Sequence, residues 1–268
     1  MGGPATRTRP RVSEPAELRA STDRYYTAYY RDTLGIPDWT TLVELRRHEE
    51  RQERPRLERL GTLLGPAALR GRLLNVGCGT GGFNVAAAAV GARAVGVDAD
   101  ADAIAICALR RDDRCRFTRA EAETLPFADN VFDVVYCFSV IEHVASVSDT
   151  IREMVRVTRP GGAIYVHTPN AWSFYEGHYK LFWAPFLPKA LGRAYLRLRG
   201  RPVAYLASLR RLTRGVIVRS FAAAGVRDLT FYDDDRPRET LGRLRLITGA
   251  YYRLSGVAPY LELIARKR

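Results

Sequence analysis

The sequence lacks the patterns that indicate a metal centre, a disulfide framework or a membrane span. Its four cysteines form no C-x-x-C pair, and its four histidines are scattered without the spacing of a zinc site. No apolar run is long enough to cross a bilayer, and no signal-peptide core is present. We therefore expect no bound metal, reduced and buried thiols, and a cytoplasmic protein.

The composition fits one sizeable α/β domain, because 47% of the 268 residues are hydrophobic. Residues 1–20 are rich in Arg, Pro, Glu and Ala, which predicts a disordered tail. Short apolar runs then alternate with helical patterns, as in a parallel sheet covered by helices on both faces. We expect strands at residues 73–76, 93–98, 116–119, 132–138, 163–168, 226–232 and 258–266.

Residues 73–88, LLNVGCGTGGFNVAAA, have the pattern of a nucleotide cradle. An apolar run ends in the glycines at 77, 79, 81 and 82, and a helical stretch follows at once. Glycine lets the backbone turn tightly and approach a ligand, while a helix N-terminus offers unpaired N–H groups. A second apolar run ends in Asp98, where an acid can accept hydrogen bonds from a ribose.

The cofactor remains ambiguous from this spacing, because Gly77, Gly79 and Gly82 also satisfy the dinucleotide pattern G-x-G-x-x-G. The segments that follow decide between the alternatives. The chain carries "NVGCGTGG", "GVD", "EAETLPF", "FDVVYCFSVIEHV" and "RPGGAIYVHTPN" in this order across residues 73–170. As a set they resemble class I S-adenosylmethionine-dependent methyltransferases, particularly the branch related to quinone-biosynthesis methyltransferases.

The resemblance implies S-adenosylmethionine as the cofactor. Asp98 would hold its ribose, and Glu121 its adenine, although many relatives carry Asp where this chain has Glu121. The residues expected to bind the cofactor are Tyr26, Tyr30, Gly77, Cys78, Gly79, Gly81, Asp98, Ala99, Glu121, Ala122 and Ser139.

The resemblance also implies a Rossmann-like, doubly wound sheet of seven strands, mostly parallel, with an antiparallel last strand. We expect an N-terminal helical lid at 21–64 and the methyltransferase domain at 65–268, with insertions at 171–212 and 236–256. The three aspartates at 233–235 fit a loop that leads into a helix near Pro237 better than a metal site.

Tyrosines at 25, 26, 29 and 30 recur at helical spacing, which places them along one face. They can pack onto the domain or close as a lid over cofactor and substrate. The charged helix that follows, at about 40–64, carries Arg46, Arg47 and Arg51, which we interpret as a solvated face.

His143 is the first candidate for a catalytic base, because it follows the fourth strand and an ordinary histidine pKa suits neutral pH. Its neighbour Glu142 would orient a ring or cap a helix. Glu176 and His178 are second candidates, because they lie on the first stretch able to fold over the strand ends.

A basic insertion extends from Gly177 to Ser220, with ten Lys and Arg residues and no Asp or Glu. Interleaved aromatic residues suit a membrane surface with a lipid-linked substrate, or a free anionic molecule. A solvated face of an arginine-rich protein is the other interpretation. RNA is disfavoured, because no RNA-binding module is recognisable.

The sequence thus predicts an S-adenosylmethionine-dependent methyltransferase that acts on oxygen of a small-molecule or lipid-linked acceptor, with peripheral membrane contact through residues 177–219. The rivals are an NAD-dependent oxidoreductase, an RNA methyltransferase and a cofactor-binding subunit without catalysis. Nothing in the sequence indicates an oligomeric state.

Overall fold

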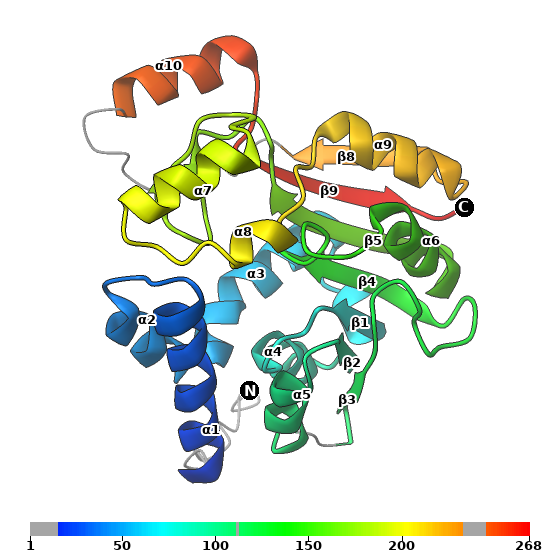
Figure 1. Cartoon of the computed structure of the whole chain (residues 1–268). Helices are drawn as coiled ribbons and strands as arrows, with labels where there is room; N and C mark the ends of the chain where they lie inside the picture. The colour runs from blue at the N-terminus through cyan, green and yellow to red at the C-terminus, as the bar shows by residue number, and fades with distance from the viewer. Residues whose placement is uncertain (1–15, 111–112, 233–244) are drawn as a thin grey trace, which may run out of the picture.

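A seven-stranded sheet with helices on both faces forms the centre of the molecule in the computed structural model, which describes residues 16–110, 113–232 and 245–268 (Figure 1). The strand order is β3-β2-β1-β4-β5-β9-β8. The strands are β1 Arg72–Val76, β2 Arg93–Asp98, β3 Cys115–Arg119, β4 Phe132–Phe138, β5 Thr158–Pro169, β8 Asp228–Tyr232 and β9 Tyr260–Arg266.

Strands β1 to β5 are parallel, and β9 runs antiparallel to both of its neighbours, β5 and β8. The predicted Rossmann-like sheet with an antiparallel last strand is therefore confirmed. Strand β5 starts five residues before the predicted 163, because Thr158 pairs with Phe132 ahead of a register shift. Since the parallel strands end at one edge, the residues that follow β1, β2 and β4 come together there.

The helices are α1 Ala16–Thr27, η1 Ala28–Thr33, α2 Trp39–Arg46, α3 Glu49–Leu64, η2 Ala68–Arg70, α4 Gly82–Ala89, α5 Ala101–Ala108, α6 Val147–Val157, α7 Lys189–Leu198, α8 Tyr205–Ser208, α9 Arg214–Ala223 and α10 Arg245–Ser255. Because α1 begins at Ala16, residues 16–20 are helical, and their expected disorder is wrong. The rest of the expected tail, and the loop and helix start expected at 233–237, lie outside the described residues.

Alternation along the strands divides the core between the two faces of the sheet. Leu74 packs with Ile151 of α6 and Phe221 of α9, whereas Leu73 packs with Leu60 of α3 and Phe83 of α4. A side chain every second residue faces the same way, so adjacent residues of β1 serve opposite cores.

A third core joins the N-terminal helices to the insertion. Tyr26, Tyr30 and Leu34 pack with Tyr179 and Leu196, which are far away in the sequence. The insertion contains a small hairpin of β6 Tyr175–Glu176 and β7 Leu181–Phe182, followed by α7 and α8. These two segments therefore form one layer above the strand ends, as Figure 1 shows for α1, α2, α7 and α8.

No helix within the described ranges is long and apolar enough to span a membrane. The four cysteines are all buried and free, as expected.

Candidate active site

A cavity of about 1280 Å³ lies where the carboxyl ends of the parallel strands meet the N-terminal helices and the insertion. Its wall includes Gly77 and Asp98 from the sheet, Tyr26 from α1, and His143 and His178. The cavity therefore brings together residues from both halves of the chain at the edge where α/β sheets bind ligands.

The glycine cradle has the backbone that its sequence requires. Gly77, Gly79 and Gly81 all have positive φ, which L-residues with a Cβ rarely adopt. A Cβ on Gly77 would also collide with the side chain of Val140. The backbone can consequently come close to a ligand at this wall.

Asp98 is fixed at the end of β2 by two backbone amides. Gly79 N–H donates to Oδ2 at 2.8 Å, and Asp100 N–H donates to Oδ1 at 3.0 Å. Burial raises the pKa of Asp98 above its ordinary value. Each carboxylate oxygen has a second lone pair, so Asp98 can still accept from a hydroxyl in the cavity.

All the expected cofactor residues except Gly81 line this cavity. Gly81 lies below it, where a Cβ would meet the ring of Phe117 at 2.8 Å. Glu121 is exposed on the cavity wall. Ser139 has a φ of 53°, an uncommon value for a serine, directly after β4.

The N-terminal helices are latched to the cradle by buried hydrogen bonds. The hydroxyl of Tyr26 donates to Glu49 at 2.5 Å and lies 3.0 Å from the hydroxyl of Thr80. Thr80 in turn donates to both oxygens of Glu49, and Arg110 pairs with the same carboxylate at 3.0 Å.

Sequence reasoning missed this latch, because Glu49 and Thr80 are separated by 31 residues. It also took Arg46 for part of a solvated face. Arg46 instead donates to the hydroxyl of Tyr30 at 2.9 Å and lies over the ring of Tyr26. The sequence signal for this role was the position of Arg46 three residues before Glu49, which allows the two side chains to meet.

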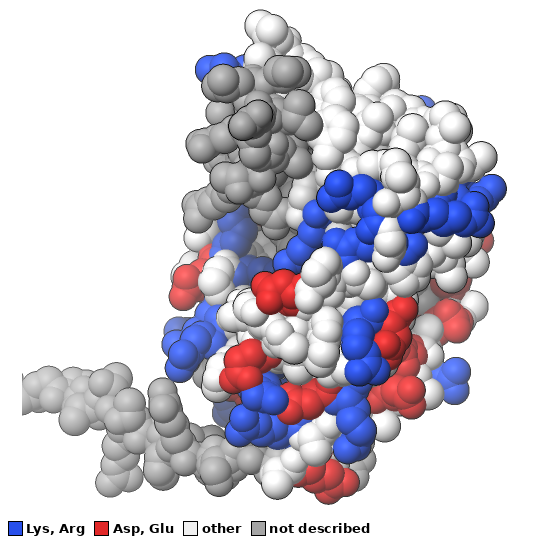
Figure 2. Space-filling model, turned by 60° about the vertical axis from the view of Figure 1, so that its left-hand side comes forward, with Lys and Arg blue, Asp and Glu red and all other residues white. Residues whose placement is uncertain are grey.

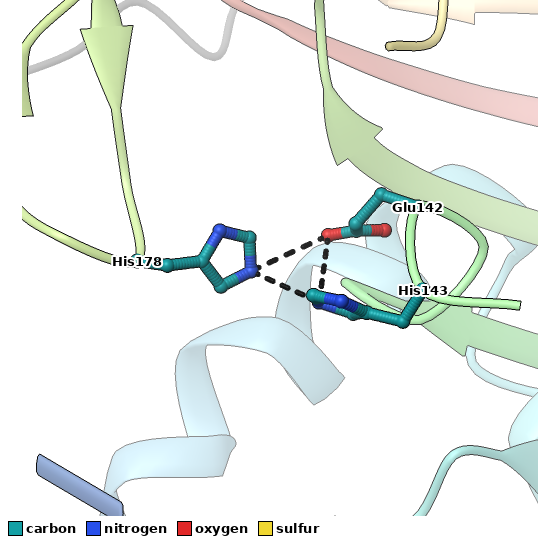
Figure 3. Close-up of side chains that lie close together, drawn as sticks. All are labelled: Glu142, His143 and His178. Carbon is teal, nitrogen blue, oxygen red and sulfur yellow. Dashed lines mark hydrogen bonds and ion pairs between the residues drawn. The ribbon is translucent and has the colours of Figure 1, made fainter. Parts of the chain in front are cut away.

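Two histidines that line the cavity, His143 and His178, meet the buried carboxylate of Glu142 (Figure 3). Nε2 of His143 lies 3.1 Å from Nε2 of His178, and Glu142 Oε1 is 4.0 and 3.8 Å from these two nitrogens. The hydroxyl of Tyr205 is 3.3 Å from His143 Nε2, and Nδ1 of His178 is 2.7 Å from Glu176. All three catalytic candidates therefore belong to one cluster.

Burial sets the charges in this cluster. Burial, and then the neighbouring His178, lower the pKa of His143 to about 4, so its expected ordinary pKa is wrong. Burial lowers the pKa of His178 too, but Glu176 outweighs this effect and leaves it raised. Burial raises the pKa of Glu142 to about 7. Glu142, expected only as an orienting or capping residue, thus lies in the same cluster as the candidate bases, as does Tyr205.

Part of the chain matches a known protein family. Residues 74–166 match the family described as "Methyltransferase domain". Over 51 residues the chain is 45% identical to a ubiquinone/menaquinone biosynthesis C-methyltransferase of Azotobacter vinelandii, covering 19% of this chain and 20% of the relative. Over 135 residues it is 30% identical to a demethylmenaquinone methyltransferase of Renibacterium salmoninarum, covering 50% of this chain and 56% of the relative.

Solved structures show the same fold. A Thermotoga maritima protein described as an S-adenosylmethionine-dependent methyltransferase, possible histamine N-methyltransferase, aligns with a TM-score of 0.55 at 20% identity, over 93% of this chain and 99% of that one. Phosphoethanolamine N-methyltransferase 2 of Haemonchus contortus, solved with S-adenosylhomocysteine, aligns with a TM-score of 0.56 at 18% identity. The alignment covers 93% of this chain and 60% of that one.

The chain spans at most 56% of the length of the two curated relatives named here. The matched segment contains the glycine cradle, Asp98 and His143, and the match favours methyl transfer over the NAD-dependent alternative. The positive-φ glycine backbone at Gly77 and Gly79 and the anchored carboxylate of Asp98 both fit a nucleoside cofactor. The chain therefore carries a class I S-adenosylmethionine-dependent methyltransferase domain, which resembles that of quinone-biosynthesis methyltransferases.

Proposed function

We propose that this protein transfers a methyl group from S-adenosylmethionine to a hydroxyl of a small-molecule or lipid-linked acceptor. One observation carries the proposal: the glycine cradle and Asp98 line the same cavity as His143, His178 and Tyr205. A cofactor and an acceptor bound against these two parts of the wall would meet within it.

Residues of the first part of the wall would hold the cofactor. Asp98 accepts from the ribose, the backbone at Gly77 and Gly79 borders the methionine part, and Tyr26 and Tyr30 close over it. When bound, S-adenosylmethionine supplies the methyl group and leaves as S-adenosylhomocysteine, while the acceptor hydroxyl loses its proton. The chain contributes mainly by aligning the partners and excluding water.

Oxygen is favoured as the methylated atom because the acceptor side of the cavity is polar. His143, His178 and Tyr205 supply groups that can bind a hydroxyl and stabilise its ionised form. The relatives named above are described as C- and N-methyltransferases, and the proposal of oxygen rests on the residues of this chain alone.

A lipid-linked or otherwise anionic acceptor is supported by the surface of the insertion. Helix α7 exposes Leu191 (57%) and Leu198 (84%) beside the exposed arginines Arg193, Arg197 and Arg199. Figure 2 shows a band of Lys and Arg side chains beneath a largely uncharged upper region on the face that it draws. Apolar side chains flanked by arginine are typical of helices that lie on anionic lipid surfaces.

Transfer of radiolabelled methyl groups tests the function. The purified chain should label hydroxylated acceptors, quinols and phenols of increasing apolar chain length, and release one S-adenosylhomocysteine per methyl transferred. Labelling of amines or carbon acceptors with no labelling of hydroxyls would refute the proposed chemistry. Binding of S-adenosylhomocysteine without turnover on any acceptor would favour the non-catalytic subunit.

A further inference from the structure

Three potential ligand atoms surround one point at the acceptor side of the cavity. They are Nε2 of His143, Nε2 of His178 and Oε1 of Glu142, and Figure 3 shows them directed toward one another. Their separations are 3.1, 3.8 and 4.0 Å. In a triangle with these sides the equidistant point is about 2.1 Å from each corner, which is the length of a bond from Zn²⁺ to a histidine nitrogen or a carboxylate oxygen.

One oxygen of the Glu142 carboxylate has a hydrogen-bond partner, and the other has none. Oε2 accepts a hydrogen bond from Thr168 at 2.9 Å, which fixes the orientation of the group. Oε1 is buried and has no hydrogen-bond partner, in a residue that is only 1% exposed. A buried carboxylate oxygen without a partner is costly, and a cation at the equidistant point would satisfy it.

A carboxylate orients the His178 ring, as is usual for histidines that bind a metal. Its Nδ1 lies 2.7 Å from Oε1 of Glu176, so a proton on Nδ1 is favoured and Nε2 keeps its lone pair. A carboxylate behind the ligating ring is the usual outer partner of a metal-bound histidine. The Glu176 side chain is itself anchored by the backbone N–H of Tyr179, at 2.6 Å.

We propose that Glu142, His143 and His178 bind a divalent transition-metal cation. Two imidazole nitrogens and one carboxylate oxygen suit Zn²⁺ and its first-row neighbours, and three protein ligands leave a coordination position open. His143, His178 and Tyr205 line the cavity, so the open position faces the acceptor. The sequence does not show the usual histidine spacing of a zinc site, because His143 and His178 lie 35 residues apart.

The site also explains how the acceptor is ionised, and this part rests on the proposed function. A cation beside a hydroxyl lowers the pKa of that hydroxyl. The released proton passes to water, and the histidines act as ligands rather than as bases. Metal binding itself requires neither cofactor nor acceptor, so the two proposals can fail separately.

Direct binding tests the site. The chain is stripped with a chelator and titrated with Zn²⁺ by calorimetry, and with Co²⁺, whose visible absorption reports the ligand set. One equivalent should bind with nitrogen and oxygen ligands. His178→Ala and Glu142→Gln should each weaken binding at least 100-fold. Glu176→Gln, which keeps all three ligands, should weaken it about 10- to 100-fold. His48→Ala removes an exposed histidine and should change nothing.

Circular dichroism of each stripped variant separates loss of the site from loss of the fold. Should His178→Ala unfold, the better-tolerated Glu142→Gln and Glu176→Gln still decide the result. Absence of a Zn²⁺ equivalent in the folded wild-type chain would overturn the proposal. So would equal affinity in wild type, Glu142→Gln and His178→Ala, because a simple hydrogen bond between the two histidines would then account for the cluster.

Discussion

The Tyr26 hydroxyl of α1 donates a 2.5 Å hydrogen bond to Glu49 of α3, the same carboxylate that accepts from Thr80 in the cradle. Glu49 is 3% exposed and also accepts from Thr80, the residue between Gly79 and Gly81. The lid and the cradle therefore share one buried carboxylate. Movement of α1 away from the cavity would expose this group and break its hydrogen bonds.

Removing the latch should loosen the lid. Tyr26→Phe deletes one hydrogen bond to a charged group, which contributes about 1.5–3 kcal/mol. We expect faster amide exchange in residues 16–36, about tenfold or more, and weaker S-adenosylhomocysteine binding. Exchange rates by mass spectrometry provide the measurement. Tyr195→Phe, in the insertion, is the matched control, and equal exchange in both variants would show that the Tyr26 bond does not hold the lid.

Cofactor binding should stabilise the folded chain. S-adenosylhomocysteine at about 100 times its Kd adds roughly 2.7 kcal/mol, which should raise the melting temperature by roughly 5–10 °C. NAD should not raise it. Asp98→Asn should reduce the affinity tenfold or more, because a charge-assisted hydrogen bond to the ribose is lost. Stabilisation by NAD alone would contradict the cofactor assignment.

Cofactor affinity should fall in acid because of Asp98. Burial raises its pKa, so protonation, which removes the charged acceptor, occurs at a higher pH than for an ordinary Asp. Affinity should be full above that raised pKa and decrease as the pH falls through it. Calorimetric titrations from pH 7 downward measure the effect. In Asp98→Asn the same decrease should disappear, and its persistence there would assign the pH dependence to another group.

The α7 surface should bind anionic vesicles. Replacing Arg193, Arg197 and Arg199 by Glu should abolish cosedimentation, since each basic residue near the surface contributes about 1 kcal/mol, screened by salt. Arg201 is not a suitable target, because its guanidinium donates to the carbonyl of Gly35. The control changes the same total charge at exposed arginines elsewhere, at Arg54, Arg116 and Arg227.

Binding by wild-type chain should increase with anionic lipid content and decrease in high salt, with cofactor affinity unchanged in both variants. Equal sedimentation with neutral and anionic vesicles would refute membrane contact through α7. A free anionic acceptor or a solvated basic face would then remain.

Local pattern predicted the strands of the sheet, the glycine turn after β1 and the acid at the end of β2. The apolar runs that precede Gly77 and end in Asp98 are recognisable in the sequence, because a strand and the turn after it are formed by neighbouring residues. The predicted strands agree with the structure closely, apart from the early start of β5. Its extra pairing depends on Phe132 in another strand, which no local pattern shows.

Only the tertiary structure shows that the candidate bases lie close together. His143 follows β4 and His178 lies in the hairpin of the insertion, so only packing of that insertion over the strand ends brings their rings to 3.1 Å. The burial that shifts the pKa values of His143 and Glu142 arises from the same packing. Glu49 and Arg46 look like surface charges in the charged helix expected at 40–64. Glu49 is buried and Arg46 is half-buried, because α1 and the cradle pack around them. Sequence spacing determines which residues share a strand or a helix, whereas distances between segments depend on how those elements pack.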